Sequence, residues 1–600
     1  MADGDEAQPK GNKIGDLRYY ARFWPFLQPY KSWIGLSFFL LPLMVLTDLA
    51  QPWILKLAID DHIAKGDLSG LPQIAGALFG LVIAAYFLGA AQVYYLQLAG
   101  LKALGDTRRA IYRHVMNQGS RFFDRHPSGS LLTRTTTDVE SLGETLTMGV
   151  VSIFGDILMI VGIVVAMLLL DVKLTLLTFA VSPLLVLVVN IFRRKLREYS
   201  VVIRKSLSKV NGYLAENLAG LKVVQLFGRE DKSLSEFRTL SYEYMDAFRK
   251  SNWYEASLYA IMDGVSNLCV ALMLWYGGLR AVAPEHSGVL TVGLLVAFIE
   301  YITRVFVPIR EFSGKLATLQ RAVAALERIF GLLDTHNEIG MGKPEWNTHE
   351  FTGSIRFENV SFAYNEKGPQ VLNGISFLME PGKVVALVGS TGSGKTTIGK
   401  LLLRLYDGYH GSIEIDGVPL KDIPSDRVHR IVGVVQQDVF LFSGTVRDNI
   451  SLKNPDISPA QVEEAAKLVG AHDFIQSLPN RYDTLIAERG ANLSAGQAQL
   501  LSFARAMAHN SPVMLLDEAT ANIDSLSEQL IQQAIARILA LKTVLIVAHR
   551  LSTIQQADEI LVLQKGVIVE RGKHAELVNH GGVYAELAKS NELAGVTNDP

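Results

Sequence analysis

Two short segments in the second half of this 600-residue chain carry residue types that could bind and hydrolyse a nucleoside triphosphate. The first is a glycine-rich run, Gly389-Ser390-Thr391-Gly392-Ser393-Gly394-Lys395-Thr396-Thr397. It follows an apolar stretch, Lys383 to Val388, that predicts a buried strand, and it precedes a predicted helix over Ile398 to Tyr406. The spacing G-x-x-x-x-G-K-T between a strand and a helix predicts a phosphate-binding loop.

The residue types of this loop suit a nucleotide with its metal ion. Glycines let backbone N–H groups turn toward phosphates, and the N-terminus of the following helix adds the positive end of its dipole. We expect Lys395 to reach the β- and γ-phosphates and the Thr396 hydroxyl to ligate Mg²⁺, which Asp517 would also hold. The sequence therefore predicts a site for ATP and Mg²⁺ in preference to a glycine-rich turn without a ligand.

The second segment is an apolar strand that begins at Val513 and ends in two acids, Asp517 and Glu518. Neighbouring residues of a strand point to opposite faces, so one carboxylate can serve the metal while the other polarises the attacking water. A further apolar strand, Thr543 to Ala548, precedes His549. Ligands collect at the carboxyl ends of parallel strands, which favours contact between His549 and the γ-phosphate over a purely structural histidine.

Between these segments lies Leu493-Ser494-Ala495-Gly496-Gln497, which resembles the signature motif of ATP-binding cassette (ABC) transporters. Other phosphate-loop ATPases lack this motif, and the resemblance covers nearly the whole chain. It implies that nucleotide contacts come from the glycine-rich run and from Tyr364, Ser494, Ala495, Gly496, Gln497 and Asp524.

The resemblance also implies individual roles. Tyr364 would stack on adenine, and Gln437 would touch Mg²⁺ and the water while sensing the membrane domain. Ser494 and Gly496 would contact a γ-phosphate bound by the opposite subunit. Asp524 matches the acid of the family's D-loop, and His549 its switch histidine. Glu488-Arg489-Gly490 resembles a loop typical of the exporter branch.

The signature departs from the family's usual pattern at two positions. Ala495 stands where glycine is usual, and Ala498 where a basic residue is common. Two interpretations remain open. The first is a tolerated variant in a homodimer, and the second is a weakened ATP site that faces a different partner chain. The second interpretation slightly favours a heterodimer.

Over the whole chain, 49% of residues are hydrophobic and the net charge is −2. The apolar residues are concentrated in long stretches of the first half. Apolar stretches near the length of a bilayer core predict membrane-spanning helices. The six predicted spans are roughly 33–57, 73–97, 147–170, 173–193, 254–279 and 289–311. Six such stretches argue against a buried helical domain.

The distribution of lysine and arginine indicates on which side of the membrane each loop between these spans lies. Residues 101–134 and 193–250 are rich in both, whereas 58–72 is led by acids, so the basic loops and both termini are expected in the cytoplasm. Phe122-Phe123-Asp124 and the stretch from Val223 to Glu230 resemble the family's two coupling helices, against the simpler interpretation of ordinary hairpin tips. Leu17 to Lys31 suits an interfacial elbow helix.

Several charged side chains fall within or near the spans. A charge at the bilayer centre costs on the order of 2.5–3.5 kcal/mol, so each is expected to face a cavity or a partner. Glu300 and Arg304 are four residues apart and are expected to pair. One hypothesis is that Asp48, Asp156 and Asp263 line a water-filled pathway that favours cationic cargo.

The fold class expected is an all-α, six-helix transmembrane domain followed by an α/β phosphate-loop ATPase domain. We expect residues 1–32 to form a cytoplasmic tail and elbow helix, 33–333 the transmembrane domain, 334–352 a linker, 353–590 the ATPase domain and 591–600 a tail.

This plan implies an ATP-driven half-transporter in the bacterial inner membrane. It would pair with a second half-transporter chain and export a small amphipathic or hydrophobic molecule such as a drug or lipid. An importer of a metal chelate and a non-transporting regulatory ATPase remain as alternatives. The membrane spans argue against a soluble ATPase that acts on nucleic acid.

Overall fold

The computed structural model describes residues 17–66, 69–145, 151–282, 291–335, 342–347, 350–365, 368–517, 525–547 and 551–596. The chain divides into two compact units. The helical unit comprises residues 1–115 and 129–335, and the sheet unit comprises residues 116–128 and 336–600. Each unit is described separately below.

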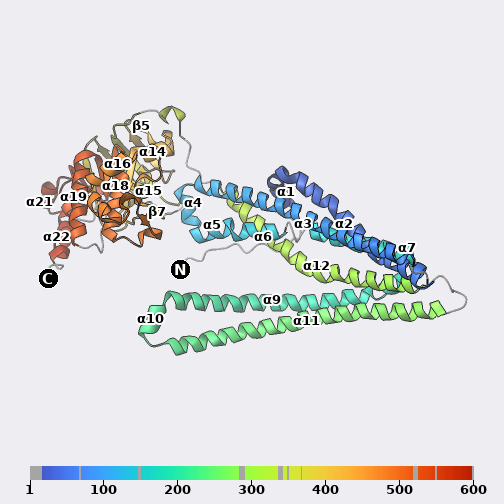
Figure 1. The fold of residues 1–600 in the computed structure, drawn as a ribbon. Coiled ribbons are helices and arrows are strands. Elements are labelled where there is room, and N and C mark those ends of the chain that lie inside the picture. Colours follow the sequence, from blue (N-terminus) through green and yellow to red (C-terminus); the bar gives the residue numbers. More distant parts are fainter. Residues whose placement is uncertain are drawn as a thin grey trace. The chain divides into compact units, whose positions relative to one another are not determined.

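The helical unit is built from helices that vary greatly in length (Figure 1). In chain order they are α1 (Leu17–Leu27), η1 (Gln28–Tyr30), α2 (Lys31–Leu57), η2 (Ala58–Ile63), α3 (Leu71–Met116), α5 (Ser128–Thr135), α6 (Thr137–Thr145), α7 (Val151–Leu170), α8 (Val172–Phe179), α9 (Ser182–Ala219), α10 (Leu221–Leu226), α11 (Glu230–Val282) and α12 (Val292–Leu333).

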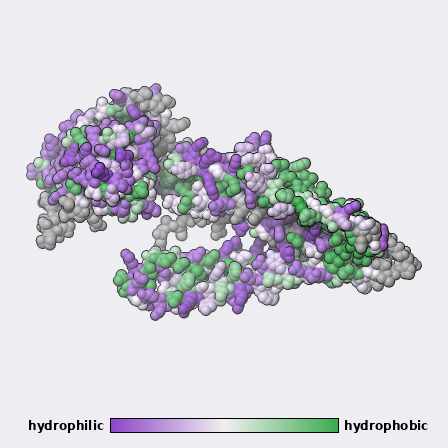
Figure 2. Space-filling view, viewed as in Figure 1, coloured by the Kyte–Doolittle hydropathy of each residue, from purple (hydrophilic) through white to green (hydrophobic). Residues whose placement is uncertain are grey.

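Five helical stretches of the described residues are long and apolar enough to cross a membrane: 18–63, 71–116, 151–170, 230–278 and 292–333. They overlap five of the six predicted spans. Large apolar side chains face outward from them, as on α3, where Phe79, Tyr86 and Phe87 are exposed. Figure 2 shows hydrophobic surface gathered over the part of the helical unit formed by α2, α3 and α7. Such a surface suits lipid as its solvent.

The span predicted over 173–193 is interrupted in the structure, which has two helices there. α8 ends at Phe179, and α9 begins at Ser182. Pro183 lies in the first turn of α9. Proline has no N–H, and its ring clashes with the carbonyl four residues earlier, which here belongs to Phe179. The helix therefore breaks between α8 and α9.

Several helices extend beyond the apolar spans. α3, α9, α11 and α12 each continue well past them, and α10 closes the hairpin of α9 and α11 (Figure 1). Asp171 alone separates α7 from α8. It caps α8, where its carboxylate accepts a hydrogen bond of 2.8 Å from the backbone N–H of Leu174.

The sheet unit contains three β-sheets. A six-stranded sheet has the order β12-β11-β3-β10-β9-β6, and all its neighbours are parallel except β11 and β12. Its strands are β3 (Val384–Val388), β6 (Val432–Val435), β9 (Val513–Asp517), β10 (Thr543–Val547), β11 (Glu559–Gln564) and β12 (Val567–Gly572). An antiparallel sheet has the order β2-β1-β4-β5, with β1 (Ile355–Phe362), β2 (Leu372–Met379), β4 (His410–Ile415) and β5 (Val418–Pro419). β7 (Gly444–Thr445) pairs with β8 (Leu485–Ile486).

Helices cover the sheets of this unit. They are α4 (Ser120–Arg125), α13 (Lys395–Leu402), α14 (Ser425–Ile431), α15 (Val446–Ser451), α16 (Pro459–Leu468), α17 (His472–Ser477), α18 (Ala495–Ala508), α19 (Ser525–Leu541), α20 (Leu551–Ile554), α21 (His574–His580) and α22 (Val583–Val596). Short 3₁₀ turns lie at η5 (Pro344–Asn347), η6 (Leu420–Asp422), η7 (Arg481–Asp483) and η8 (Glu488–Gly490).

Every residue of β3 and β10 is buried, because the six-stranded sheet is covered on both faces. Alternate residues of β3 enter two different hydrophobic cores. Val384, Ala386 and Val388 belong to one core, and Val385 and Leu387 belong to the other. The period of two that defines a strand thus explains why the predicted strand is apolar at every position.

The helix predicted over Ile398 to Tyr406 has different bounds in the structure. α13 begins at Lys395 and ends at Leu402. Arg404 then adopts a positive φ of 52°, and its buried guanidinium donates a hydrogen bond to the carbonyl of Ile423. A left-handed residue cannot continue a right-handed helix, so the helix ends before it.

Gly411 lies where the backbone of β4 approaches the backbone of β1 closely. A Cβ on Gly411 would lie 2.4 Å from the carbonyl oxygen of Asn359, and the residue has a φ of +92°. Gly417 has a similar φ of +79° with no atom within 4 Å of its added Cβ. We expect Gly417→Ala to cost about 1 kcal/mol through backbone strain alone, and Gly411→Ala to cost clearly more.

The measurement is the apparent melting temperature of the sheet unit in the full chain, by differential scanning calorimetry. Gly417→Ala serves as the control for backbone strain. Equal losses in the two variants would contradict the close approach of β4 to β1.

Candidate functional site

The predicted phosphate loop lies between β3 and α13. Two of its glycines are required by close backbone approaches. An added Cβ on Gly389 would lie 2.2 Å from the carbonyl oxygen of Leu563, and one on Gly394, which has a φ of +105°, would lie 2.7 Å from a side-chain carbon of Leu372. The loop therefore packs closely against Leu563 of β11 at Gly389 and against Leu372 of β2 at Gly394.

Lys395 is held across the loop. Its Nζ donates hydrogen bonds to the carbonyl oxygens of Gly389, at 2.6 Å, and Ser390, at 3.0 Å. Burial lowers the pKa of this ammonium group, and the negative charge of Asp517 opposes that shift. An ammonium group has three N–H donors, so one remains for a phosphate oxygen. A bound triphosphate would supply the negative charge that a buried cation needs.

Two hydroxyls of the loop also suit an anionic ligand and its metal. Ser393 Oγ is buried, and in the described part of the chain it has no hydrogen-bond partner. Buried hydroxyls are almost always paired, so water or a ligand is expected there. Thr396 is exposed at the start of α13, as a metal-ligating hydroxyl must be.

Mg²⁺ keeps several waters and takes one or two protein oxygens beside the phosphates, so one hydroxyl and one carboxylate of the protein are enough to hold it. Asp517, the last residue of β9, is placed for this role at the same edge of the sheet as the phosphate loop. It pairs in register with Val547 at the end of β10.

The structure describes only part of the predicted hydrolytic machinery. Gln437 follows β6 by two residues and is exposed. Because β3, β6, β9 and β10 run parallel, the segments that follow them meet at one edge. Glu518, Asp524 and His549 lie outside the described residues, so their roles stay predictions.

The predicted signature segment forms the start of α18. Ser494 caps this helix: its Oγ accepts a hydrogen bond from the N–H of Gln497, at 3.2 Å, and the Gln497 side chain accepts one from the N–H of Ser494, at 3.0 Å. Ser494 and Ala495 are exposed, whereas Gly496 is buried. The side chain of Gln497 is thus engaged in the cap, and the exposed helix start is left available for an anion.

Tyr364 lies beside the phosphate loop. Its hydroxyl shares a hydrogen bond of 3.0 Å with Oγ1 of Thr397, and its ring packs edge-on against Tyr406 with centroids 5.1 Å apart. The Nζ of Lys400 lies 5.6 Å from the centre of the Tyr364 ring. Neither Tyr406 nor Lys400 was expected at this position from the sequence.

The first predicted coupling segment is α4, which belongs to the sheet unit. Phe122 is completely buried, and Asp124 accepts a hydrogen bond of 2.7 Å from the hydroxyl of Tyr406. Burial, and then this bond to a carboxylate, raise the pKa of Tyr406, so the phenol stays protonated as a donor. A cavity of about 400 Å³ lies between α4 and the ring of Tyr364; it is lined by Arg121, Asp124, Arg125, Tyr364, Asn365, Lys400 and Tyr406.

The second predicted coupling segment is α10, which belongs to the helical unit. The tip of this hairpin exposes Val223, Leu226 and Phe227. Leu226 and Phe227 retain 82% and 76% of their accessible surface, so α10 presents an unpaired apolar knob. Such a knob suits docking against a groove of another domain.

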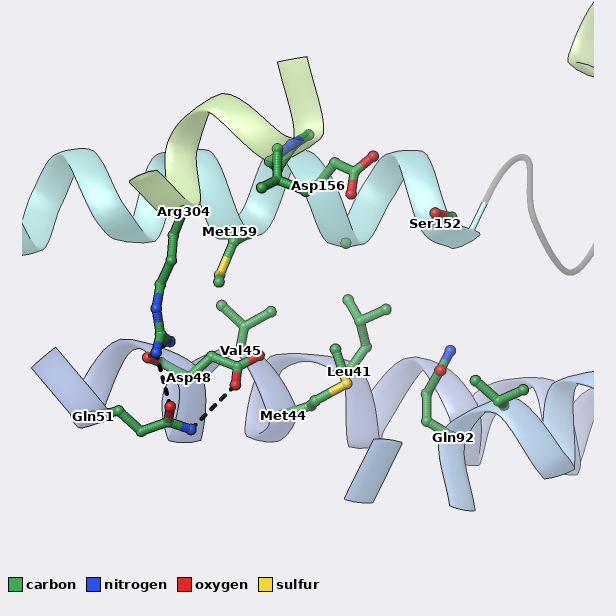
Figure 3. A pocket seen from close by; sticks show the side chains of 14 residues that line it. Leu41, Met44, Val45, Asp48, Gln51, Gln92, Ser152, Asp156, Met159 and Arg304 are labelled. Atoms are coloured by element: carbon green, nitrogen blue, oxygen red, sulfur yellow. Dashed lines mark hydrogen bonds between the residues drawn. The ribbon is translucent and has the colours of Figure 1, made fainter. Parts of the chain in front are cut away.

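A second candidate site is a pocket of about 540 Å³ in the helical unit, called here the α2–α12 pocket (Figure 3). It is lined by residues of α2, α3, α7 and α12: Leu41, Met44, Val45, Asp48, Gln51, Gln92, Val93, Ser152, Gly155, Asp156, Met159, Arg304, Val307 and Pro308. Its volume is within the usual range for small-molecule sites.

Asp48, Asp156 and Asp263, which were expected to line a pathway, differ in their positions and in their ion pairs. Asp48 and Asp156 line the α2–α12 pocket, but Asp263 does not. Asp156 forms a 2.6 Å ion pair with Lys315, and the mostly exposed Asp263 lies 3.3 Å from Arg310. The expected pair of Glu300 and Arg304 is present, but only at 3.7 Å.

Comparison with known protein families gives two matches along the chain. Residues 34–309 match the model described as the ABC transporter transmembrane region, and residues 372–521 match the model described as ABC transporter. The first match begins within α2 and ends within α12, and the second includes the phosphate loop and the signature segment.

Two proteins of Bacillus subtilis (strain 168) resemble the chain over nearly its full length. The uncharacterized ABC transporter ATP-binding protein YknV is 34% identical, over 95% of this chain and 94% of that protein. The putative multidrug export ATP-binding/permease protein YgaD is also 34% identical, over 94% of this chain and 98% of that protein. A solved structure of a bacterial Atm1-family ABC exporter with ATP bound has 27% identity and a TM-score of 0.74, covering 93% of this chain and 97% of its own.

The role of Tyr364 can be tested by removing its ring. Stacking of a base on an aromatic ring contributes about 1–3 kcal/mol, so Tyr364→Ala should raise the dissociation constant for ATP by roughly five- to 150-fold. Tyr364→Phe keeps the ring and loses only the bond to Thr397, so it should bind nearly as well as the parent chain. Isothermal titration calorimetry with ATP measures both. Unchanged affinity in the alanine variant would refute the stacking role.

The bond between Tyr406 and Asp124 can be tested by a double-mutant cycle. A hydrogen bond to a charged group contributes about 1.5–3 kcal/mol, so Tyr406→Phe and Asp124→Asn should each lower the melting temperature of the sheet unit. Because Tyr406→Phe removes this bond and Asp124→Asn weakens it by removing the charge of the acceptor, the double variant should lose less than the sum of the two single losses. Additive losses would show that α4 is held by other contacts.

Proposed function

Because the chain belongs to the ABC transporter family, we propose that it exports a small amphipathic or hydrophobic molecule as one half of a two-chain transporter. Family membership makes the chain an ATP-binding, multi-pass membrane protein whose ATPase activity drives translocation, with its ATPase domain in the cytoplasm. The observation that carries export is the exporter fold, which matches the Atm1-family structure over 93% of this chain. The name of YgaD, putative multidrug export protein, agrees with this direction.

The α2–α12 pocket supports an amphipathic cargo. Its walls combine apolar side chains, such as Met44 and Met159, with the polar side chains of Asp48, Gln51 and Arg304. A ligand with an apolar body and a polar end would satisfy both kinds of wall. Import of a metal chelate and a purely regulatory role have no comparable support among the described residues.

Hydrolysis follows from the residues at the edge of the six-stranded sheet. Lys395 and the loop N–H groups hold the phosphates, and Gln437 positions the attacking water. Glu518 polarises that water and accepts its proton while the γ-phosphoryl group passes to the water oxygen, and His549 contacts the γ-phosphate. Mg²⁺, held by Thr396 and Asp517, would neutralise charge that develops on the leaving phosphate.

The transport cycle is alternating access. ATP binds the closed arrangement of two chains more tightly than the open one, and it therefore shifts the population toward the closed state. α4 and α10 are the segments suited to carry this change to the membrane helices. Hydrolysis then removes the ligand that favours closure.

A second half-transporter chain completes each ATP site in this proposal. The start of α18 exposes Ser494 and Ala495, and within the described residues no side chain of Ser494 to Gln497 hydrogen-bonds to the phosphate loop. This arrangement supports contact with a phosphate carried by another chain. The methyl group of Ala495, and Ala498 in place of a basic residue, favour a different chain over a second copy.

The assignment of Glu518 as the base gives a direct test. Glu518→Gln removes the proton acceptor but keeps the size and polarity of the side chain. We expect ATP affinity within about twofold of the parent chain and a rate of hydrolysis at least about 100-fold lower, since general-base catalysis contributes about 10²–10⁴-fold. The measurement is phosphate release by protein in lipid nanodiscs, with ATP binding measured on the same sample. Near-normal turnover in this variant would disprove the assignment.

A further inference from the structure

The polar end of the α2–α12 pocket is organised by a proline in α2. In an α-helix the N–H of residue 52 would bond to the carbonyl of residue 48, but Pro52 has no N–H. The carbonyl oxygen of Asp48 instead accepts a 2.7 Å hydrogen bond from Nη1 of Arg304 on α12. The hydroxyl of Tyr301 donates a 2.7 Å bond to the next carbonyl, that of Leu49. Two successive carbonyls of α2 thus hold two side chains of α12.

Arg304 makes its close contacts with neutral acceptors. Besides the Asp48 carbonyl, its guanidinium donates to Oε1 of Gln51 at 2.9 Å, as Figure 3 shows. The nearest carboxylate in an ion pair with Arg304 is that of Glu300, at 3.7 Å. Neutral acceptors leave the positive charge of a guanidinium largely uncompensated in an apolar setting. An anionic group would be a stronger acceptor for Arg304 than a carbonyl or an amide.

The carboxylate of Asp48 lies at the same end of the pocket and has weaker contacts than Arg304. Its only hydrogen bond among the described residues comes from Nε2 of Gln51, at 3.4 Å, and no ion pair of the described residues includes it. Figure 3 shows Gln51 linked to both Asp48 and Arg304. By contrast, Asp156 is neutralised by Lys315 at 2.6 Å. One carboxylate and one guanidinium therefore lie at this end without an ion pair shorter than 3.7 Å, joined through Gln51.

We propose that the α2–α12 pocket selects zwitterionic amphiphiles, with a cationic group at Asp48 and an anionic group at Arg304. This inference rests on the proposed export function and names the class of its cargo. A cation alone would meet the like charge of Arg304, and an anion alone would meet that of Asp48. A head group with both charges avoids each repulsion. The apolar part of the ligand lies against Leu41, Met44 and Val45.

This pattern changes the hypothesis of three aspartates that favour cationic cargo. Of the three, only Asp48 both lines the pocket and has no ion-pair partner among the described residues. The positive charge that accompanies it comes from Arg304, four residues after Glu300 on α12. Selection by charge therefore depends on a pair of side chains from two helices.

The test uses three single-chain probes with alkyl chains of seven or eight carbons and different head groups: octyltrimethylammonium, octanoate and the zwitterion N-octyl-N,N-dimethylglycine. Full-length protein in lipid nanodiscs is titrated with each probe, with empty nanodiscs as the blank. Binding is measured by calorimetry, and ATPase stimulation is measured on the same samples. We expect the zwitterion to bind at least about tenfold more tightly than either singly charged probe.

Charge-removing variants decide which side chain recognises which group. Asp48→Asn should shift the preference toward octanoate, and Arg304→Gln should shift it toward octyltrimethylammonium. Asp263→Asn is the matched control, since it removes an exposed aspartate outside the pocket, and it should leave the order of affinities unchanged. A purely structural role for Asp48 or Arg304 would weaken all three probes alike.

The outcomes separate this inference from the export proposal. If the zwitterion binds best but no probe stimulates ATP hydrolysis, the selectivity of the pocket stands and its role as a cargo site fails. If a probe stimulates hydrolysis without a preference for the zwitterion, the export proposal stands and the zwitterion inference is overturned. A preference for octyltrimethylammonium that Arg304→Gln does not change would also overturn it.

Discussion

The parallel pairing of β3, β6, β9 and β10 is the constraint on which the nucleotide site depends. Parallel strands send their carboxyl ends to one edge, and burial on both faces keeps that edge rigid. Residues more than a hundred positions apart, such as Lys395 and Asp517, are thereby brought to one side of the sheet. β11 adds the close approach of Leu563 that requires glycine at 389.

The helical unit meets a different constraint, because its polar groups must find partners inside an apolar structure. The proline at 52 leaves a carbonyl without its helical donor, and Arg304 supplies one. Lys315 similarly compensates Asp156. Each pair joins α12 to another helix of the unit, so the polar contacts that satisfy these groups also fix which helices face the pocket.

The phosphate loop, its flanking strands and most membrane spans could be predicted from the sequence because their signals are local. A glycine-rich run after an apolar strand, or twenty apolar residues in a row, specifies its own structure. The interruption between α8 and α9 was missed although Pro183 carried the signal. Apolar composition alone cannot distinguish one span from two shorter helices.

The features that could not be predicted depend on contacts between distant segments. Nothing near Tyr406 indicates that its hydroxyl meets Asp124, 282 residues earlier, or that its ring packs on Tyr364. Helical spacing predicted that Arg304 pairs with Glu300. It could not predict that Arg304 forms shorter hydrogen bonds to α2. The sequence shows that Pro52 has no N–H to donate to the carbonyl of Asp48. Only the fold shows that Arg304 is the side chain that donates to it instead.

We propose that the exposed start of α18 acts on a nucleotide held by another chain. Photocrosslinking from a benzoylphenylalanine at Ala491, an exposed residue just before the signature, tests it directly. The experiment uses the Glu518→Gln variant in native membranes, with and without ATP. We predict an ATP-dependent adduct between two chains, which mass spectrometry places near the phosphate loop of the second chain. An adduct with the chain's own residues 389–397, or a pattern that ignores ATP, would contradict the claim.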